Sequence, residues 1–449
     1  MTEHSPSPLI IIGGGASGAI MAAHLLALPR PDLRIVLIEK RPSFGKGIAY
    51  STELPAHVLN VRASRMSLYA DDPGHFWRWL RESRLAGPGN SEASFVPRMF
   101  YGRYLAETLH RLSEQERGTG RLQLLHDEAI SVTPSASGVE IRLASGARIA
   151  GRAVILATGH EDQPSPERCF SVRPGSSSDT PVGPDDPILI LGTGLSMADT
   201  LLLLEQSGHR GPVTVLSRRG LIPLPHGESN PVVFGEADIP FGAQPSRFMQ
   251  WLRDTIRRRA VQGGDWRDVV DGLRPFNQRI WRSWPMAARS RFLRHAKARW
   301  DIHRHRLPPW VHGLIVEQIR SGRVRLLAGR VLDVRKHGEN CEVRIQQSHS
   351  HAPETLTAAR IYDCTGLARN LSASSNKAVR SVIDGGLARP DPLHLGLDVT
   401  PQCAVIAKDG SVSGKMFAIG PLTRGTFFEI DAVPDIRIQC AELARQLAG

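Results

Sequence analysis

The sequence predicts an α/β fold built from two Rossmann-like dinucleotide-binding domains, with β-meander insertions and a helical, arginine-rich segment. Two observations carry this prediction. A glycine-rich turn joins a short apolar run to a helical pattern twice, first after Ile12 and again after Leu191. Each of these units is followed by alternating apolar and polar residues that end in an apolar run and a Thr-Gly pair. Such a repeat indicates that each dinucleotide unit carries a sheet and a crossover of its own.

The first unit spans residues 9–39 and is predicted to bind FAD. Leu9 to Ile12 is typical of a strand buried on both faces, and the glycines that follow have G-x-G-x-x-G spacing. The helix Ala16 to Leu28 would aim its N-terminal amides at a pyrophosphate. The strand Ile35 to Ile38 ends in a carboxylate that can accept both ribose hydroxyls and would repel a 2′-phosphate. The predicted site residues here are Gly13, Gly15, Ala16, Ser17, Gly18, Glu39 and Lys40.

Three more segments are expected around a bound flavin. The loop and helix at residues 44–80 leave the second strand where the isoalloxazine would extend. A third strand, Ala153 to Ala157, ends in Thr-Gly, and small residues there let the chain cross tightly over the cofactor. A late strand, Met416 to Ile419, precedes a glycine turn that is expected to meet the far phosphate or the ribityl chain. The candidates are Asn60, Met66, Ser67, Thr158, Gly159, Gly420 and Pro421.

The second unit follows a Pro-, Gly- and Ser-rich linker at residues 163–187 and is predicted to bind NADPH. It comprises a strand to Leu191, a helix from Leu195 to Gln206 and a strand from Val213 to Leu216. Met197 replaces the third glycine, which loosens the match. Two guanidiniums and a hydroxyl stand where the first unit has its carboxylate, and they would bind a 2′-phosphate by charge and hydrogen bonds. The predicted site residues are Gly192, Gly194, Ser196, Ser217, Arg218 and Arg219.

The net charge of +12 is concentrated in one segment. Residues 251–310 hold fourteen Arg and one Lys against five Asp, which accounts for ten of these charges. A solvated face of the mostly helical segment 245–310 explains such a composition, and an anionic substrate, an acidic partner protein or nucleic acid are the alternatives. Nucleic acid is disfavoured, because the tryptophans among the arginines are irregularly spaced and no RNA-binding motif is present.

The expected domains are 1–165, the first part of the FAD-binding domain, then 185–325 with the insertion 245–310, and 326–449. The last of these holds a second meander and the return of the chain to the FAD domain. The five cysteines lack a C-x-x-C pair and metal-ligand spacing, so neither a redox-active disulfide nor a metal is expected. No apolar run reaches the roughly 18–20 residues that span a bilayer, and the N-terminal residues lack a signal peptide, so the predicted compartment is the cytoplasm.

Several motifs resemble one bacterial family more narrowly. They are GKGIAYST, HVLNVRASRMSLYADDP with HFWRWL, LSRRGLIPLPH, DCTGLARN and FAIGPLTRGTFFEIDAVPDIRIQ. With these motifs the chain is similar, over nearly its whole length, to bacterial FAD/NAD(P)-binding proteins grouped with flavin-dependent aspartate N-monooxygenases and urate-hydroxylase-like flavoproteins. The resemblance implies FAD at Gly13, Gly15, Gly18 and Glu39, and NADPH at Gly192, Gly194 and Arg218. Met197 departs from the pattern and affects the expected tightness of the nicotinamide site.

The leading hypothesis is an FAD-dependent monooxygenase. NADPH would reduce FAD, and the reduced flavin would activate oxygen as a flavin hydroperoxide that transfers one oxygen atom. The resemblance implies a small amine or amino-acid substrate, and the excess arginine favours an anionic one. No catalytic side chain is assigned. The alternatives are an NADPH-dependent flavin reductase or dehydrogenase without oxygen insertion, and a flavoprotein redox sensor or interaction module that binds an acidic partner through residues 251–310.

Overall fold

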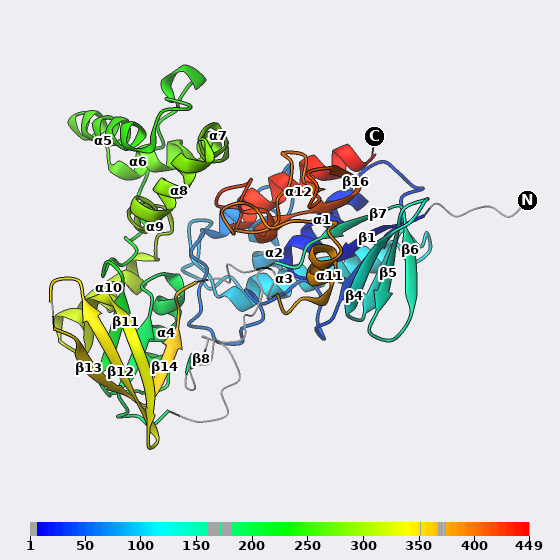
Figure 1. Cartoon of the computed structure of the whole chain (residues 1–449). Coiled ribbons are helices and arrows are strands. Elements are labelled where there is room, and N and C mark those ends of the chain that lie inside the picture. Colours follow the sequence, from blue (N-terminus) through cyan, green and yellow to red (C-terminus); the bar gives the residue numbers. More distant parts are fainter. Residues whose placement is uncertain are drawn as a thin grey trace, which may run out of the picture. The chain divides into compact units, whose positions relative to one another are not determined.

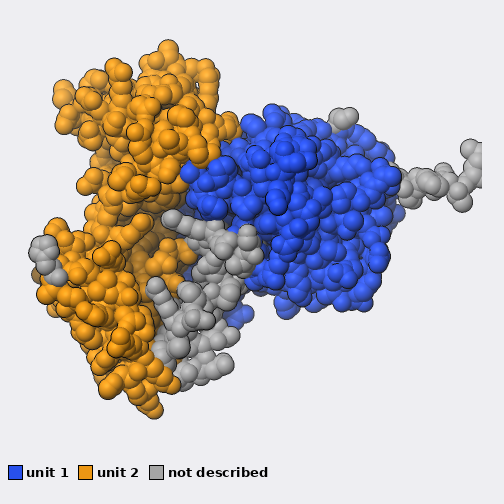
Figure 2. All heavy atoms as spheres, in the orientation of Figure 1, with its two compact units in different colours: residues 1–163, 367–449 blue, residues 164–366 orange. Residues whose placement is uncertain are grey.

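The computed structural model describes residues 7–159, 182–350, 352–366, 371 and 374–448, together with the backbone of residues 171–172. The chain divides into two compact units, which are shown in Figures 1 and 2. Unit 1 comprises residues 1–163 and 367–449, and unit 2 comprises residues 164–366. Unit 1 is therefore built from both ends of the chain.

The main sheet of unit 1 has the strand order β15-β16-β7-β1-β2-β3. Its central strands are short and wholly buried, because aliphatic side chains face helices on one side and the rest of the core on the other. The strands are β1 (Leu9–Ile12), β2 (Ile35–Glu39), β3 (Leu122–His126), β7 (Ala153–Leu156), β15 (Ala404–Ile406) and β16 (Val412–Ala418). Except for the antiparallel edge pair β15 and β16, neighbours in this sheet run parallel, so the carboxyl ends of β1, β2 and β7 meet at one edge.

Helices and a smaller sheet complete unit 1. The helices are α1 (Ala16–Leu26), α2 (His75–Glu82), α3 (Arg98–Gln115), α11 (Lys377–Asp384) and α12 (Val433–Ala448). The antiparallel meander β4 (Ala129–Pro134), β5 (Val139–Leu143) and β6 (Arg148–Gly151) forms a sheet separate from the main one. Helix α1 is almost entirely buried, and α12 from the end of the chain packs beside it. The predicted strand β1 and the closing helix from Val433 are confirmed, whereas α1 ends two residues earlier than predicted.

Unit 2 repeats the strand, turn and helix order of unit 1. Its sheet has the order β13-β12-β11-β10-β9-β14-β8. The strands are β8 (Ser171–Val172), β9 (Ile188–Leu191), β10 (Val213–Ser217), β11 (Val324–His337), β12 (Asn340–Gln347), β13 (Glu354–Ala358) and β14 (Arg360–Asp363). Helix α4 (Leu195–Gln206) follows β9 with the bounds that the sequence predicts. The second dinucleotide-type unit is thus present as a complete βαβ element.

Strand β11 explains why the second meander belongs to unit 2. Its first residues, Val324 to Ala328, pair parallel with β10. The same strand then continues without a break, and Gly329 to His337 pair antiparallel with β12. Residues 326–366 therefore lie with the second unit, and not with the C-terminal part of the chain as the expected domain 326–449 has them.

The arginine-rich segment forms a cluster of short helices at one end of unit 2 (Figure 1). They are α5 (Pro245–Val261), α6 (Trp266–Gly272), α7 (Asn277–Ser283), α8 (Met286–His295) and α9 (Lys297–Arg304), and α10 (Pro309–Arg320) leads back to the sheet. Trp281, Trp284 and Phe292 are buried and pack against one another, which agrees with a packing role for the tryptophans. Part of the positive charge is structural, because Arg259 and Arg306 pair with aspartates inside the cluster.

Replacing Asp268 by asparagine is expected to destabilise unit 2 by about 2–4 kcal/mol. The Asp268 carboxylate is buried and accepts hydrogen bonds from Arg259 Nε at 2.8 Å and from the Asn230 amide at 2.7 Å. An asparagine would turn an NH₂ group toward one of these donors. Chemical denaturation of the full chain measures the loss. Asp254→Asn is the control, because its exposed pair with Arg257 contributes less than about 1 kcal/mol.

The same carboxylate makes this stability depend on pH. Burial alone would raise the pKa of Asp268, but the hydrogen bonds from Arg259 and from backbone amides outweigh burial and lower it. The pKa of Asp268 is lower in the folded protein than its unfolded value of about 4. The stabilisation that its ionised carboxylate contributes is therefore complete at pH values above the unfolded pKa. It is lost as the pH falls further, through the lower pKa of the folded protein. In Asp268→Asn, the part of the pH dependence of the unfolding free energy that comes from this carboxylate should disappear.

Within the described residues, no helix combines the length and the hydrophobicity that crossing a membrane requires.

Candidate functional site

At two positions of the first glycine turn, neighbouring backbone atoms leave no room for a side chain. Gly13 has a φ of +104°, and a Cβ there would lie 2.6 Å from the carbonyl oxygen of Ala157, at the end of β7. A Cβ on Gly18 would lie 1.9 Å from the carbonyl oxygen of Gly13. These contacts bring the turn, the start of α1 and the end of β7 together at the carboxyl edge of the sheet. Dinucleotides bind at this edge in doubly wound folds.

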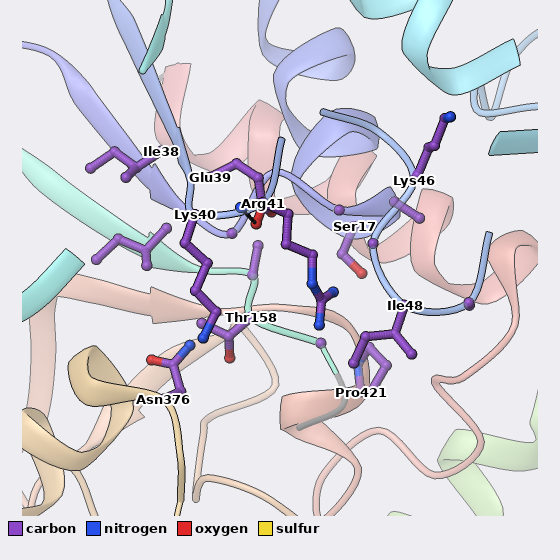
Figure 3. Close-up of a pocket in the computed structure, with 18 of the residues that line it drawn as sticks. Ser17, Ile38, Glu39, Lys40, Arg41, Lys46, Ile48, Thr158, Asn376 and Pro421 are labelled. Carbon is purple, nitrogen blue, oxygen red and sulfur yellow. Dashed lines mark hydrogen bonds between the residues drawn. The ribbon is translucent and has the colours of Figure 1, made fainter. Parts of the chain in front are cut away.

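A hollow that is partly open to solvent lies at this edge of unit 1, and the space in it, counting the part open to solvent, is about 1150 Å³. Figure 3 shows that its walls come from the glycine turn, the end of β2, the loop after it and the C-terminal part of the chain. Nine of the predicted residues line it: Gly13, Gly15, Ala16, Ser17, Glu39, Lys40, Thr158, Gly159 and Pro421. Predictions made from segments far apart in the sequence thus meet at one place.

The other predicted residues of the first site do not line this hollow. Gly18 is a packing residue of the turn itself. Met66 is buried in the core, and Ser67 is fully buried with its hydroxyl accepting a hydrogen bond from the Tyr69 amide. Asn60 is likewise absent from the lining. Gly420 is buried beside Ser17, and its amide donates to Gln439 Oε1 at 2.7 Å, so that amide is already engaged.

Glu39 has two backbone hydrogen bonds that fix its carboxylate at the end of β2. Oε2 accepts from the Gly14 amide at 2.8 Å, and Oε1 accepts from the Arg41 amide at 2.9 Å. The side chain is 7% exposed. A carboxylate has about four acceptor positions, so two hydrogen bonds leave capacity for further donors such as hydroxyl groups. The carboxylate is held in place, and it lines the hollow at the position expected for ribose recognition.

The loop after Glu39 folds back onto the glycine turn. The Gly45 amide donates to the Gly14 carbonyl oxygen at 2.6 Å, and a Cβ on Gly15 would lie 3.2 Å from Gly47 Cα. Gly45 and Gly47 have φ angles of +87° and +56°, which glycine adopts without strain. Residues 44–80 were expected around a bound flavin, but no residue of this glycine loop was predicted as a site residue. Its two spaced glycines were the available signal for a second wall of the site.

The other end of the hollow is closed by charges from three segments. Glu128 pairs with Lys40 at 3.5 Å and with Lys377 at 2.6 Å. Burial by itself raises the pKa of Glu128, but the hydrogen bond from Lys377 and the charge of Lys40 outweigh burial and lower it. Glu128 therefore stays ionised at neutral pH. Neither Glu128 nor Lys377 was identified from the sequence, because nothing local marks a contact between such distant residues.

Two features show that the hollow fits a dinucleotide such as FAD. In the described chain, no side chain caps the N-terminus of α1, and its first turn holds no acidic residue. Its amides and positive dipole end are thus left for an anion. Thr158 Oγ1 is buried at the wall and has no hydrogen-bond partner among the described residues. A buried hydroxyl without a partner costs free energy, so a ligand that accepts or donates there would be favourable.

Unit 2 repeats the first turn with two differences. Gly192 has a φ of +100°, and a Cβ there would lie 2.3 Å from the carbonyl oxygen of Cys364, which follows β14. This matches the contact of Gly13 with Ala157. Gly194 has open space around it, and Ser196 lies in the first turn of α4. The position of Gly18 is taken by Met197, which is buried, so here the helix stands far enough away to admit a side chain.

The second difference lies at the end of β10, where a hydroxyl replaces the carboxylate of Glu39. Ser217 Oγ accepts hydrogen bonds from Thr193 Oγ1 at 3.1 Å and from the Gly220 amide at 3.0 Å. Arg218 is exposed, whereas Arg219 donates to the backbone carbonyl of Arg294 in α8 at 3.2 Å. The structure therefore separates the two arginines: the Arg218 side chain lies in solvent, and Arg219 ties the loop to the helical insertion.

A metal site and a protein disulfide find no support in the described residues. No group of three or more His, Cys, Asp or Glu side chains could hold a metal ion there. Cys341, Cys364, Cys403 and Cys440 are buried, and none of them forms a disulfide with another described residue. Cys169 lies outside the described residues.

Two glycine turns of this kind, each at the carboxyl edge of its own parallel sheet, define an α/β protein with two dinucleotide-binding units. Residues 10–161 match the model of a family described as FAD-NAD(P)-binding. This part of the chain is therefore an FAD/NAD(P)-binding domain. A search of curated proteins gives no match.

Three solved structures share the fold over nearly the whole chain. An ornithine N-hydroxylase from Kutzneria sp. 744 has a TM-score of 0.65 at 13% identity, covering 99% of both chains. A cadaverine monooxygenase from Erwinia amylovora, bound to FAD, has a TM-score of 0.66 at 15% identity, covering 99% of this chain and 95% of that one. An L-lysine 6-monooxygenase from Pseudomonas syringae has a TM-score of 0.61 at 17% identity, covering 98% of this chain and 99% of that one. At these identities the likeness shows a common fold.

Proposed function

We propose that the chain is an FAD- and NADPH-dependent monooxygenase that hydroxylates a small amine or amino acid on nitrogen. One observation carries the proposal: two dinucleotide turns share a geometry but differ in the group that follows the second strand. Unit 1 places the Glu39 carboxylate there, and unit 2 places Ser217 and Arg218. Such a pair suits a flavin nucleotide without a 2′-phosphate and a nicotinamide nucleotide with one.

In unit 1 the proposed role of the residues is to bind and orient FAD. The amides at the start of α1 would face the pyrophosphate, and Glu39 would accept ribose hydroxyls in the capacity left by its two backbone hydrogen bonds. Gly13 and Gly18 keep the turn compact, and Thr158 would offer its hydroxyl from the wall. When bound, FAD would supply the two-electron and oxygen chemistry that amino-acid side chains lack.

In unit 2 the proposed role is to bind NADPH in preference to NADH. Ser217 is uncharged, so unit 2 lacks the carboxylate that would repel a 2′-phosphate. The exposed Arg218 would pair with that phosphate. Thr193 and the Gly220 amide position the Ser217 hydroxyl.

The choice of a monooxygenase over a reductase rests on likeness and on chemistry. The ornithine, cadaverine and lysine enzymes that share the fold are hydroxylases or monooxygenases by name. In addition, the sequence holds no C-x-x-C pair that could take electrons from a flavin. We therefore assign oxygen and an organic substrate as the acceptors of the electrons that leave the flavin.

The test follows oxygen and product together. The purified chain is loaded with FAD and mixed with NADPH, oxygen and a panel of amines: ornithine, lysine, cadaverine and aspartate. One of these should yield a hydroxylamine, with one NADPH oxidised and one O₂ consumed per product, the second oxygen atom leaving as water. Reduction of another acceptor at an unchanged rate without air would instead favour the reductase. Failure of NADPH to reduce the flavin would favour the interaction module.

The cytoplasmic location and an acidic partner for residues 251–310 stay predictions from the sequence.

A further inference from the structure

We propose that Arg41 binds the pyrophosphate of the dinucleotide in unit 1 and sets the strength of its retention. This inference rests on the proposed FAD site, and it adds a cationic contact that the glycine turn alone does not provide. It is carried by the placement of Arg41 in the hollow and by the different placement of the two neighbouring lysines.

Arg41 is anchored where its side chain can reach the ligand. Its amide donates to Glu39 Oε1 at 2.9 Å, which ties the start of the loop to the end of β2. The loop is tied again by the Gly45 amide to Gly14, so both sides of Arg41 are fixed to the glycine turn. Arg41 lines the hollow, and Figure 3 shows its guanidinium reaching into it. The glycine turn and the backbone of Arg41 thus belong to one hydrogen-bonded frame, from which the guanidinium extends.

The two other cations of this wall are placed differently. Lys40 extends toward the Asn376 end of the hollow and pairs with Glu128 at 3.5 Å. Lys46 lies on the same loop as Arg41, but Figure 3 shows its ammonium group pointing away from the hollow. Three cations near one site therefore differ in direction, and Arg41 is the one directed at its interior.

A guanidinium suits this position chemically. A pyrophosphate carries two negative charges, and its oxygens can accept parallel hydrogen bonds from the fork of an arginine. The N-terminus of α1 contributes only partial positive charge through its amides and dipole. The lining also includes the acids Glu39, Asp127, Glu128 and Asp431. Their negative charges would repel the phosphates, and a full positive charge close to the phosphates would offset this repulsion.

The experiment separates phosphate binding from binding of the nucleoside. The full-length chain is freed of flavin, and ADP and adenosine are titrated separately by calorimetry. In Arg41→Ala the Kd for ADP should rise about 10- to 100-fold, the range of a charge-assisted hydrogen bond, while the Kd for adenosine stays unchanged. Arg41→Lys should be intermediate for ADP, because it keeps the charge and loses the fork. Lys46→Ala, the matched control, should bind both ligands as the unaltered chain does.

A second measurement does not require removal of the flavin. The FAD-loaded variants are desalted at increasing salt concentrations, and the flavin that stays bound is measured by its visible absorbance. Arg41→Ala should lose its FAD at salt concentrations at which Lys46→Ala remains loaded. Equal weakening of ADP and adenosine in Arg41→Ala, or no weakening of ADP, would overturn the role of Arg41. If the unaltered chain binds neither FAD nor ADP, the assignment of this hollow to FAD is wrong, and the role of Arg41 is overturned with it.

Discussion

Replacement of Gly18 by alanine is expected to abolish retention of FAD. The new Cβ would lie 1.9 Å from the carbonyl oxygen of Gly13, which belongs to the backbone and cannot move without opening the turn. The amides of α1 would then leave the phosphate position, and binding should fall by more than about 100-fold, the loss of several hydrogen bonds to a charged group. The flavin absorbance of the purified variant, after addition of excess FAD and desalting, measures the effect.

Two controls distinguish this local effect from general unfolding. Gly313→Ala adds the same methyl group in α10, where nothing lies within 4 Å of it, and should leave flavin content unchanged. NADPH binding to unit 2 should persist in Gly18→Ala, because that unit has its own core. Full flavin content in Gly18→Ala would contradict the assignment of the first turn.

Replacement of Arg218 by alanine is expected to remove the preference for NADPH. Loss of one guanidinium that pairs with the 2′-phosphate should raise the Kd for NADPH about 10- to 100-fold. The Kd for NADH should not change, since NADH lacks that phosphate. Tryptophan fluorescence titration with the two nucleotides gives both values. Arg210→Ala is the matched control, because this exposed arginine of the same unit pairs with Asp185 at 3.0 Å.

Arg219 is expected to respond differently from its neighbour. Its side chain donates to the Arg294 carbonyl oxygen. Arg219→Ala should therefore weaken NADPH and NADH together, through the position of the loop. If Arg218→Ala weakened the binding of NADPH and NADH equally, this result would contradict the pairing of Arg218 with the 2′-phosphate.

The parts of the fold that could be predicted are those with a local physical cause. Leu9 to Ile12 are apolar without interruption because both faces of β1 are covered, and the glycine after them marks the end of the strand. Helix α4 has the predicted bounds because a glycine and a Ser-Gly pair flank an apolar pattern of helical period. The second meander was placed with the C-terminal part because the sequence does not show that β11 continues from a parallel into an antiparallel pairing.

The candidate site was predictable at its glycine turn and at the ends of the strands β2, β7 and β16. Asn60, Met66 and Ser67 follow the second strand in sequence, but the loop at Gly45 turns back toward Gly14 and supplies the wall instead. The charges that close the far end come from residues separated by more than 80 positions, and no sequence period records such contacts. Arg41 follows two predicted residues directly, yet only the fold shows which of three neighbouring cations is directed inward.

The split of unit 1 around unit 2 affects how the chain is made. Strand β7 is synthesised after its neighbour β1, but long before β16, which pairs with its other edge. At about 5–20 residues per second, synthesis of unit 2 takes on the order of 10–40 s. During this time an apolar strand edge and the face of α1 that α12 later covers stay open to solvent, which is the condition that favours aggregation and chaperone binding. Unit 1 can thus be completed only after unit 2 has been synthesised.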